Sequence, residues 1–210
     1  IPAIPAVLSA AEWAEFAAAV GEEVTIALAD AGVPLAPVAL AVASSSGDRR
    51  GWVDLRSPDL GAAVVVTLSE WFTDPAREII GCDLKELLRL APAAGEVCVA
   101  RLFDLMLASY LCKASVHGHS LDEIALERTG SKLRSAKEAG FDKGVEPALG
   151  DERVGAWVAE RLAAVERFAP LLRQELGTGA LLDLYRRIES PLLPVLVGME
   201  EAGIRLDVEF

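Results

Sequence analysis

Apolar residues in the first 60 positions occur in short runs separated by turn residues, a pattern typical of strands joined by turns. Before them, the capping-box spacing from Ser9 to Glu12 and an alanine-rich run predict a helix over residues 10–20. Three strands are then expected, at Val24–Leu28, Val38–Ala43 and Trp52–Leu55, with turns at GVPLAP and SSSGDRRG between them. We expect these strands to form an antiparallel meander.

After Gly61 the apolar spacing changes, and helices are expected to alternate with strands. The stretch VVVTLSEWFTD predicts a helix, REIIG predicts a strand, and Asp83 is placed to cap a helix over DLKELLRLA that ends before Pro92. A further apolar run, VCVARLFD, precedes two stretches that predict helices, LMLASYLCKA and SLDEIALERTG. Residues 131–152 are polar and lack a clear period, so we expect a loop with short helical pieces.

The last third of the chain is expected to be helical. Apolar residues recur at three- and four-residue spacing from position 154 to 172, which predicts a long amphipathic helix that Pro170 kinks or ends. A second helix is expected over Leu181–Ile188, and Ser190-Pro191 predicts the start of a third that stops near Gly203. This order of elements predicts an α/β fold in which helices flank a mixed sheet.

Composition narrows the class of protein. At 210 residues and 52% hydrophobic, the chain can bury a substantial core. No apolar run reaches the ~20 residues of a membrane helix, and the start, IPAIPAVLSA, lacks the basic residues of a signal peptide. We therefore expect a cytoplasmic monomer with no membrane partner.

The cysteines, Cys82, Cys98 and Cys112, show no CxxC spacing and are expected to be reduced and buried. A net charge of −12 repels polyanions, so this chain alone is expected to bind DNA weakly or not at all.

Four stretches resemble the 3′–5′ exonuclease domain of bacterial family A DNA polymerases, the DNA polymerase I family. They are GCDLKELLRL (81–90), FDLMLASYL (103–111), HGHSLDEIALERTG (117–130) and LLDLYRRIESPLLPVLVGMEEAGIRLDVEF (181–210). The last resembles the junction between the exonuclease and polymerase domains. The resemblance implies a ribonuclease H-like fold, with a mixed sheet of about five strands flanked by helices and a helical C-terminal segment. It also implies an exonuclease-like domain over 1–186 and, over 187–210, a lead-in helix to a polymerase domain that this chain does not contain.

Nucleases of this family use two divalent metals, Mg²⁺ or Mn²⁺, ~3.5–4 Å apart, which need about four carboxylates. The family carries them as DxE on the first strand, the final D of GHNLKYD and the D of a late helical YxxxD. Aligned with VTIALADAG, the first two fall on Ala29 and Ala31, and the third falls on Leu87. The YxxxD pair falls on Val154 and Val158, which also belong to the apolar stripe and are expected to face the core. A slip of one residue would bring Asp30 and Gly32 to the first two positions.

The resemblance therefore implies no catalytic residue and no metal cofactor in this chain. It implies a vestigial, inactive exonuclease-like domain with a structural or domain-positioning role in DNA replication and repair. Its partner would be the polymerase domain of the same parent chain, a DNA-directed DNA polymerase that contacts DNA.

Two alternatives remain open. One is an active metal-dependent proofreading exonuclease whose acids are misaligned, with Asp30, Asp83, Asp104 or Glu160 brought together by the fold. The other is a module that binds a DNA end or a partner protein without cleavage.

Other polar residues have simpler expected roles. We expect His117 and His119 to be solvated loop residues rather than metal ligands, and Asp104 to be a helix cap or a buried hydrogen-bond partner rather than a catalytic acid. Asp30 and Asp83 alone are not expected to hold a cation. The candidate phosphate-facing residues are instead expected to form a solvated face interleaved with Glu138 and Asp142; they are Arg49, Arg50, Lys132, Arg134, Lys137 and Lys143.

Overall fold

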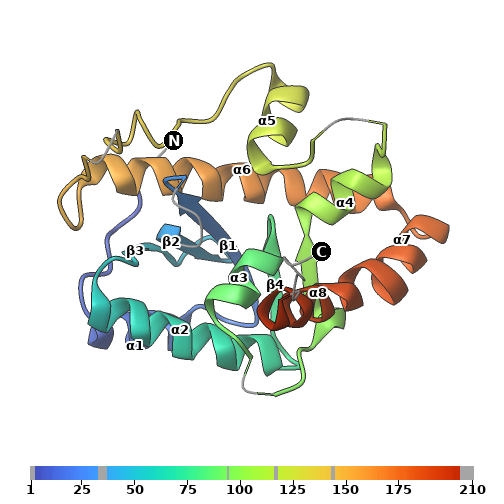
Figure 1. The fold of residues 1–210 in the computed structure, drawn as a ribbon, viewed down its shortest axis with the longest axis horizontal. Coiled ribbons are helices and arrows are strands. Elements are labelled where there is room, and N and C mark those ends of the chain that lie inside the picture. Colours follow the sequence, from blue (N-terminus) through green and yellow to red (C-terminus); the bar gives the residue numbers. More distant parts are fainter. Residues whose placement is uncertain (1–2, 33–36, 94, 116–117, 143–144, 204–210) are drawn as a thin grey trace, which may run out of the picture.

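A computed structural model describes residues 3–32, 37–93, 95–115, 118–142 and 145–203. The described residues form one five-stranded sheet with the strand order β3-β2-β1-β4-β5 (Figure 1). β1 pairs antiparallel with β2, and β2 with β3, whereas β1–β4 and β4–β5 are parallel. The predicted meander and the mixed sheet of about five strands are confirmed. The strands are β1 (Glu23–Asp30), β2 (Pro37–Ser44), β3 (Arg50–Asp54), β4 (Glu78–Gly81) and β5 (Leu102–Asp104).

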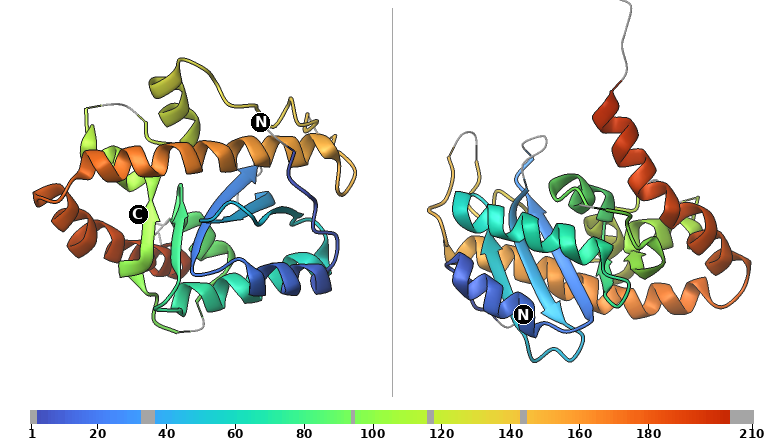
Figure 2. Two further views of the ribbon diagram at one scale, coloured as in Figure 1. Left: turned by 180° about the vertical axis from the view of Figure 1, so that it is seen from behind. Right: turned by 90° about the horizontal axis from the view of Figure 1, so that it is seen from below.

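Helices cover both faces of this sheet. On one face, α1 (Ala10–Ala19) and α2 (Pro58–Thr73) lie side by side, and on the other α6 (Glu152–Leu176) crosses the strands (Figures 1 and 2). Side chains alternate between the faces of a strand, so each face has its own cluster of buried apolar residues. The fold is ribonuclease H-like, as the resemblance implies.

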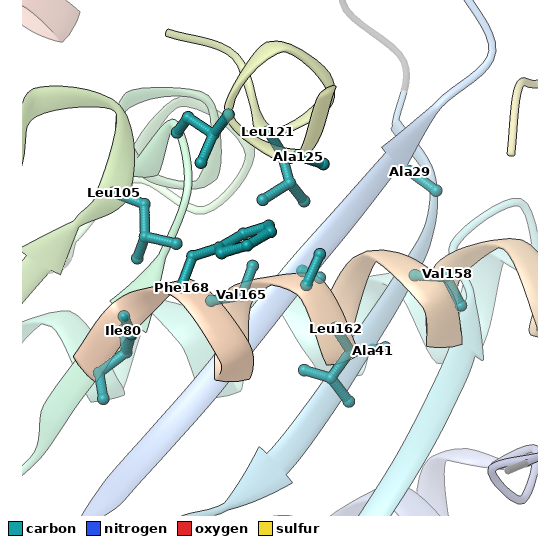
Figure 3. Packing of buried hydrophobic residues seen from close by; sticks show 14 of the residues in the cluster. Ala29, Ala41, Ile80, Leu105, Leu121, Ala125, Val158, Leu162, Val165 and Phe168 are labelled. Carbon is teal, nitrogen blue, oxygen red and sulfur yellow. The ribbon is translucent and has the colours of Figure 1, made fainter. Parts of the chain in front are cut away.

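The face beneath α6 is built mainly from alanines. Five of them are at most 3% exposed, and all lie in the cluster that also contains the apolar stripe of α6. These are Ala27, Ala29, Ala39, Ala41 and Ala43. The opposite face carries larger side chains from the same strands, among them Ile26, Leu40 and Val42. Small side chains leave room for a helix to pack closely on the strands, and Figure 3 shows Ala29 and Ala41 near Val158 and Leu162 of α6.

Several element boundaries differ from those predicted. α2 begins earlier than VVVTLSEWFTD, because Ser57-Pro58 provides a cap position and a proline at the helix start. The run VCVARLFD contributes only a short 3₁₀ turn, η1 (Val99–Arg101), and strand β5. The remaining helices of this half match their predictions: α1, α3 (Leu84–Leu90), α4 (Leu105–Cys112) and α5 (Leu121–Thr129). The turn at residues 33–36 and His117 lie outside the described residues.

Pro170 does not end the long C-terminal helix, contrary to one form of the prediction. α6 continues through it to Leu176, because Leu172 and Leu176 keep the apolar stripe buried beyond the proline. Burying those two side chains offsets the single backbone hydrogen bond that proline cannot donate.

The C-terminal segment is one continuous helical stretch. α7 (Ala180–Leu184) leads into a π-helical turn, η2 (Tyr185–Glu189), and then into α8 (Ser190–Ala202). Ser190 does not cap a new helix, contrary to prediction: its backbone angles are helical, and its hydroxyl donates to the Val99 carbonyl at 2.8 Å. Pro191 lacks the N–H that would bond four residues back, and the N–H of Ser190 bonds to the Tyr185 carbonyl in the wider turn.

Two further observations bear on the class of protein. All three cysteines are free, as expected, but they are half-buried rather than buried. Within the ranges that the structure describes, no helix combines the length and apolar character needed to cross a bilayer.

Candidate functional site

A cavity of about 420 Å³ opens where β1 and β4 end. Carboxyl ends of neighbouring strands with connections leading in different directions are common ligand sites in α/β folds. β1 contributes Leu28 and Asp30, and the junction of β4 and α3 contributes Cys82, Asp83 and Glu86. The rest of the lining comes from the loop after β1, the start of β2, α5, the loop after α5, and α6: Gly32, Pro37, Asp122, Arg134, Ser135, Ala136, Trp157 and Arg161.

The residues that the sequence comparison aligned with the family's metal-binding acids are apolar, and most of them are buried. Ala29 and Val158 are 0% exposed and belong to the cluster beneath α6, against which the half-buried Ala31 also packs. Leu87 is 1% exposed and lies in the cluster on the other face of the sheet. None of these side chains carries an oxygen, so they do not fit a magnesium or manganese ion.

A second pair of residues on α6 has the same four-residue spacing and lines the cavity. Trp157 and Arg161 are about one helical turn apart. The Arg161 Nε donates to the Leu28 carbonyl at 2.9 Å, and its Nη2 lies 3.0 Å from the Asp122 carboxylate. The Arg161 side chain is only 16% exposed. A fixed guanidinium therefore lies at the carboxyl end of β1, and a cation there repels a metal ion.

Three of the four carboxylates that line the cavity are held by other partners. Asp30 accepts the Gly32 N–H at 2.7 Å, Glu86 pairs with Arg89, and Asp122 pairs with Arg161. Asp83 has a left-handed backbone with φ of 59°, and burial, followed by the charge of Glu86, raises its pKa above the ordinary value. Among the residues that the structure describes, no group of three or more His, Cys, Asp or Glu side chains is placed to hold a metal ion.

Asp104 is a buried structural acid, as predicted. Only 1% exposed, it accepts backbone N–H groups from Asp83 at 3.1 Å, Leu84 at 2.7 Å and Met106 at 2.8 Å. It therefore serves the starts of both α3 and α4. The prediction that Asp83 caps α3 is wrong in its mechanism, because Asp83 occupies the cap position without a side-chain cap bond. The Tyr185 hydroxyl accepts the Asp104 N–H at 2.6 Å and donates to the Leu102 carbonyl at 3.2 Å.

Burial raises the pKa of Asp104 to about 6 from its ordinary 3.8, against the lowering effect of the backbone N–H groups of Leu84 and Met106. Between these values the folded state binds a proton that the unfolded state does not. We therefore expect this group's contribution to stability to be greatest at low pH and to fall with a slope of up to about 1.4 kcal/mol per pH unit as pH rises to about 6. Urea unfolding of the natural protein and of Asp104→Asn at several pH values would show a steeper fall of stability with pH in the natural protein.

Of the remaining candidate residues that the structure describes, only Arg134 lines the cavity. His119 is half-buried rather than solvated, with Nδ1 2.9 Å from the Ser109 hydroxyl. Three of the basic candidates pair with acids, as expected of a solvated face: Arg50–Glu166 at 2.9 Å, Arg134–Glu160 at 3.7 Å and Lys137–Asp142 at 3.3 Å. Arg49 and Lys132 are exposed, and Lys143 lies outside the described residues.

Sequence reasoning missed the cavity-lining role of Trp157, Arg161 and Asp122. The sequence did carry a signal for Arg161. It is a charged residue beside the apolar positions 158 and 162 of the predicted helix, and it lies one helical turn after a tryptophan.

Comparisons of the sequence with known proteins show which proteins this chain resembles. No protein-family model matches the sequence. DNA polymerase I of Bacillus subtilis is 30% identical over 110 residues, which span 51% of this chain and 12% of that protein. DNA polymerase I of Pseudomonas aeruginosa is 29% identical over 156 residues, 69% of this chain and 16% of that protein. The resemblance to DNA polymerase I is confirmed. The chain thus matches only a small part of the length of the DNA polymerase I relatives.

Solved structures support the same fold. The POL domain of Pol1 from M. smegmatis, in complex with DNA primer-template and dNTP, has a TM-score of 0.66 at 23% identity, and the match covers 98% of this chain and 33% of that one. NrnC of Brucella melitensis with bound Mg²⁺ has a TM-score of 0.60 at 16% identity, covering 89% of each chain. Ribonuclease D of Trypanosoma brucei, in complex with GMP, has a TM-score of 0.66 at 9% identity, covering 98% of this chain and 67% of that one.

Proposed function

We propose that this chain is a catalytically inactive 3′–5′ exonuclease-like domain of a DNA polymerase I, with a structural or domain-positioning role in DNA replication and repair. The exonuclease-like part spans 1–186, and 187–210 leads into the polymerase part of the parent protein. We further propose a cytoplasmic location and contact with DNA through the parent rather than through this domain.

The observation that carries the proposal is the chemistry at the carboxyl end of β1. Two-metal hydrolysis needs carboxylates that converge on two divalent cations. In this chain Ala29 lies beneath α6, Leu87 lies in the opposite core cluster, and the Arg161 guanidinium is held on the Leu28 carbonyl. The residues aligned with the family's acids are therefore apolar, and the side chain fixed on the Leu28 carbonyl is positively charged, which supports an inactive domain. We derive no hydrolytic step for this chain.

The direct test is a nuclease assay on the 210-residue protein. A single-stranded DNA labelled at its 5′ end is incubated with excess protein and Mg²⁺ or Mn²⁺, and shortening from the 3′ end is followed by gel electrophoresis. We expect no shortening beyond that in buffer, because the ligands for the metals are missing. An unrelated 3′–5′ exonuclease added to the same buffer controls for the substrate.

A matched variant separates true activity from contamination. Asp30→Asn/Asp83→Asn removes two carboxylates that line the cavity. Metal-dependent shortening by the natural protein that disappears in this variant would establish the active-exonuclease alternative. Equal shortening by both would identify a contaminant.

One observation favours the second alternative, a module that binds a DNA end without cleavage. Arg134 lines the cavity, and its side chain is 39% exposed, so a cation is accessible to a phosphate there. In contrast, four carboxylates line the same cavity, and their negative charges repel a phosphate ligand. Binding of single-stranded DNA that falls steeply with salt would favour this alternative.

A further inference from the structure

A second cavity, of about 300 Å³, lies between α5, the chain that follows α5, and α6. It shares no lining residue with the cavity at the end of β1. We call it the α5–α6 groove. Half of its lining is apolar, and these residues form its floor: Ala125, Leu133, Ala163, Ala164 and Phe168.

The side of the groove that α6 provides is one face of that helix. Its members follow the three- and four-residue spacing of a helix face: Glu160, Ala163, Ala164, Arg167 and Phe168. The two alanines fill little of the space between α6 and the chain after α5. Phe168 is 2% exposed, and Figure 3 shows its ring pointing from α6 toward Ala125 of α5. The floor is therefore made of small side chains and one buried aromatic ring.

Two ion pairs hold the walls of the groove in place. The Arg128 guanidinium makes two contacts of 2.7 Å with the Glu175 carboxylate, which joins the end of α5 to α6. Further along the chain, the Arg134 backbone N–H donates to the Glu160 carboxylate at 3.3 Å, and its guanidinium Nε lies 3.7 Å from the same group. These contacts bracket the groove along α6. The groove is preformed, so a ligand does not have to order its walls.

The charged side chains of the groove favour an anion. Lys132 and Arg167 line it, and both are exposed. Within the described ranges neither forms an ion pair, whereas the one carboxylate of the lining, Glu160, is paired with Arg134. The guanidinium carbon of Arg167 lies 5.8 Å from the centroid of the Phe168 ring, so a cation adjoins the apolar floor. On a chain with a net charge of −12, this groove has two cations for one carboxylate.

We propose that the α5–α6 groove binds a small organic anion, with an apolar body the size of a phenyl ring or a short acyl chain and one carboxylate or phosphate group. The apolar body packs on the floor, and the anionic group lies beside Lys132 and Arg167. An apolar lining with a few charged groups is typical of small-molecule sites, whose volumes begin at roughly 300 Å³. The volume of this groove therefore favours a small molecule over a peptide or a nucleic-acid strand.

The test is isothermal titration calorimetry of the 210-residue protein with 4-phenylbutanoate and with phenyl phosphate. We expect at least one of these probes to bind with a Kd of about 1 mM or lower. 4-Phenylbutan-1-ol has the same body without the charge and should bind at least about tenfold more weakly, because it cannot pair with the two cations. Acetate and inorganic phosphate carry the charge without the body and should also bind at least about tenfold more weakly.

Three variants locate the site. Lys132→Gln/Arg167→Gln should weaken binding of the anionic probe about tenfold and leave the alcohol unaffected. Ala163→Leu fills the groove from a half-buried position and should weaken binding of both. Lys137→Gln removes an exposed cation that does not line the groove, and it is the matched control that should change neither. Equal thermal midpoints of the natural protein and the variants show that each variant is folded.

Several results would each overturn the inference. They are no detectable binding at about 10 mM probe, equal binding of 4-phenylbutanoate and the alcohol, undiminished binding in Ala163→Leu, and amide shifts in NMR spectra that centre on the cavity at the end of β1 instead of on residues 131–133 and 163–168. A natural protein that sediments as a dimer, and as a monomer in Ala163→Leu, would assign the groove to a second copy of the chain. The nuclease assay is independent of these results, so an active exonuclease would refute the proposed inactivity without affecting this site.

Discussion

Replacing Asp104 with alanine is expected to lower the free energy of unfolding by about 3–5 kcal/mol. The Asp104 carboxylate is buried and accepts three backbone N–H groups, from Asp83, Leu84 and Met106. Alanine would leave these donors without a partner at the starts of α3 and α4. Each unsatisfied buried donor costs about 1–3 kcal/mol, and the loss is partly offset because a desolvated carboxyl group is also removed. Urea unfolding at neutral pH measures the difference.

Two further variants make the Asp104 result specific. Asp104→Asn retains one acceptor oxygen and should lose less stability than Asp104→Ala. Asp183→Ala removes an exposed carboxylate and should change the free energy of unfolding by about 0.5 kcal/mol or less. A loss below about 1 kcal/mol for Asp104→Ala would mean that water or relaxed backbone satisfies the three donors, and Asp104 would then not be what organises the edge of the sheet beside the cavity.

The sheet and most helices could be predicted because their signals are local. Alternating and continuous apolar runs fix β1, β2 and β3, and the Ser120–Glu123 capping box fixes the start of α5. The errors arise where distant residues decide. Asp104 replaces Asp83 as the acceptor at α3, and the Val99 carbonyl takes the Ser190 hydroxyl that the sequence suggested as a cap. Neither partner is visible from the sequence around the helix start.

The candidate site was predictable in part. The sequence places an alanine at position 29, and the structure adds the reason why an alanine is suited there. Ala29 is one of five alanines that form the floor beneath α6, and Val158 lies in the same cluster. An aspartate at position 29 would put a carboxylate into this contact. An alanine at position 29 therefore suits the close apolar packing of α6 on β1.

The register on α6 could not be settled from the sequence, because Val154–Val158 and Trp157–Arg161 share the same four-residue spacing. Apolar periodicity indicated that the valines face the core, and both are 0% exposed. It gave no sign that Arg161 would reach the Leu28 carbonyl, because that contact depends on how α6 lies across the sheet.

Aspartate substitutions at Val158 and Arg161, which end the two pairs with four-residue spacing on α6, are expected to have very different effects. Val158→Asp puts an unpaired carboxylate into a fully buried site and should cost about 3–5 kcal/mol of folding free energy. Arg161→Asp faces the cavity, where water reaches the new carboxylate, and should cost about 1–2 kcal/mol through the lost contacts with Leu28 and Asp122. Thermal or urea unfolding of both variants, with Val158→Thr as an uncharged control, measures the difference.

Stabilisation by Mn²⁺ tests whether the positive charge of Arg161 keeps metal ions out of the cavity. Arg161→Asp removes a positive charge from a cavity that already holds Asp30, Asp83, Glu86 and Asp122, and adds a negative one. If the resulting site has a Kd near 1 mM, about 10 mM Mn²⁺ would stabilise the variant by about 1.4 kcal/mol. We expect this shift in Arg161→Asp and not in the natural protein or in Arg161→Met, which loses the guanidinium without gaining an acid. Stabilisation of the natural protein by Mn²⁺, or of a well-folded Val158→Asp variant instead of Arg161→Asp, would show that a metal-binding arrangement persists around Val158.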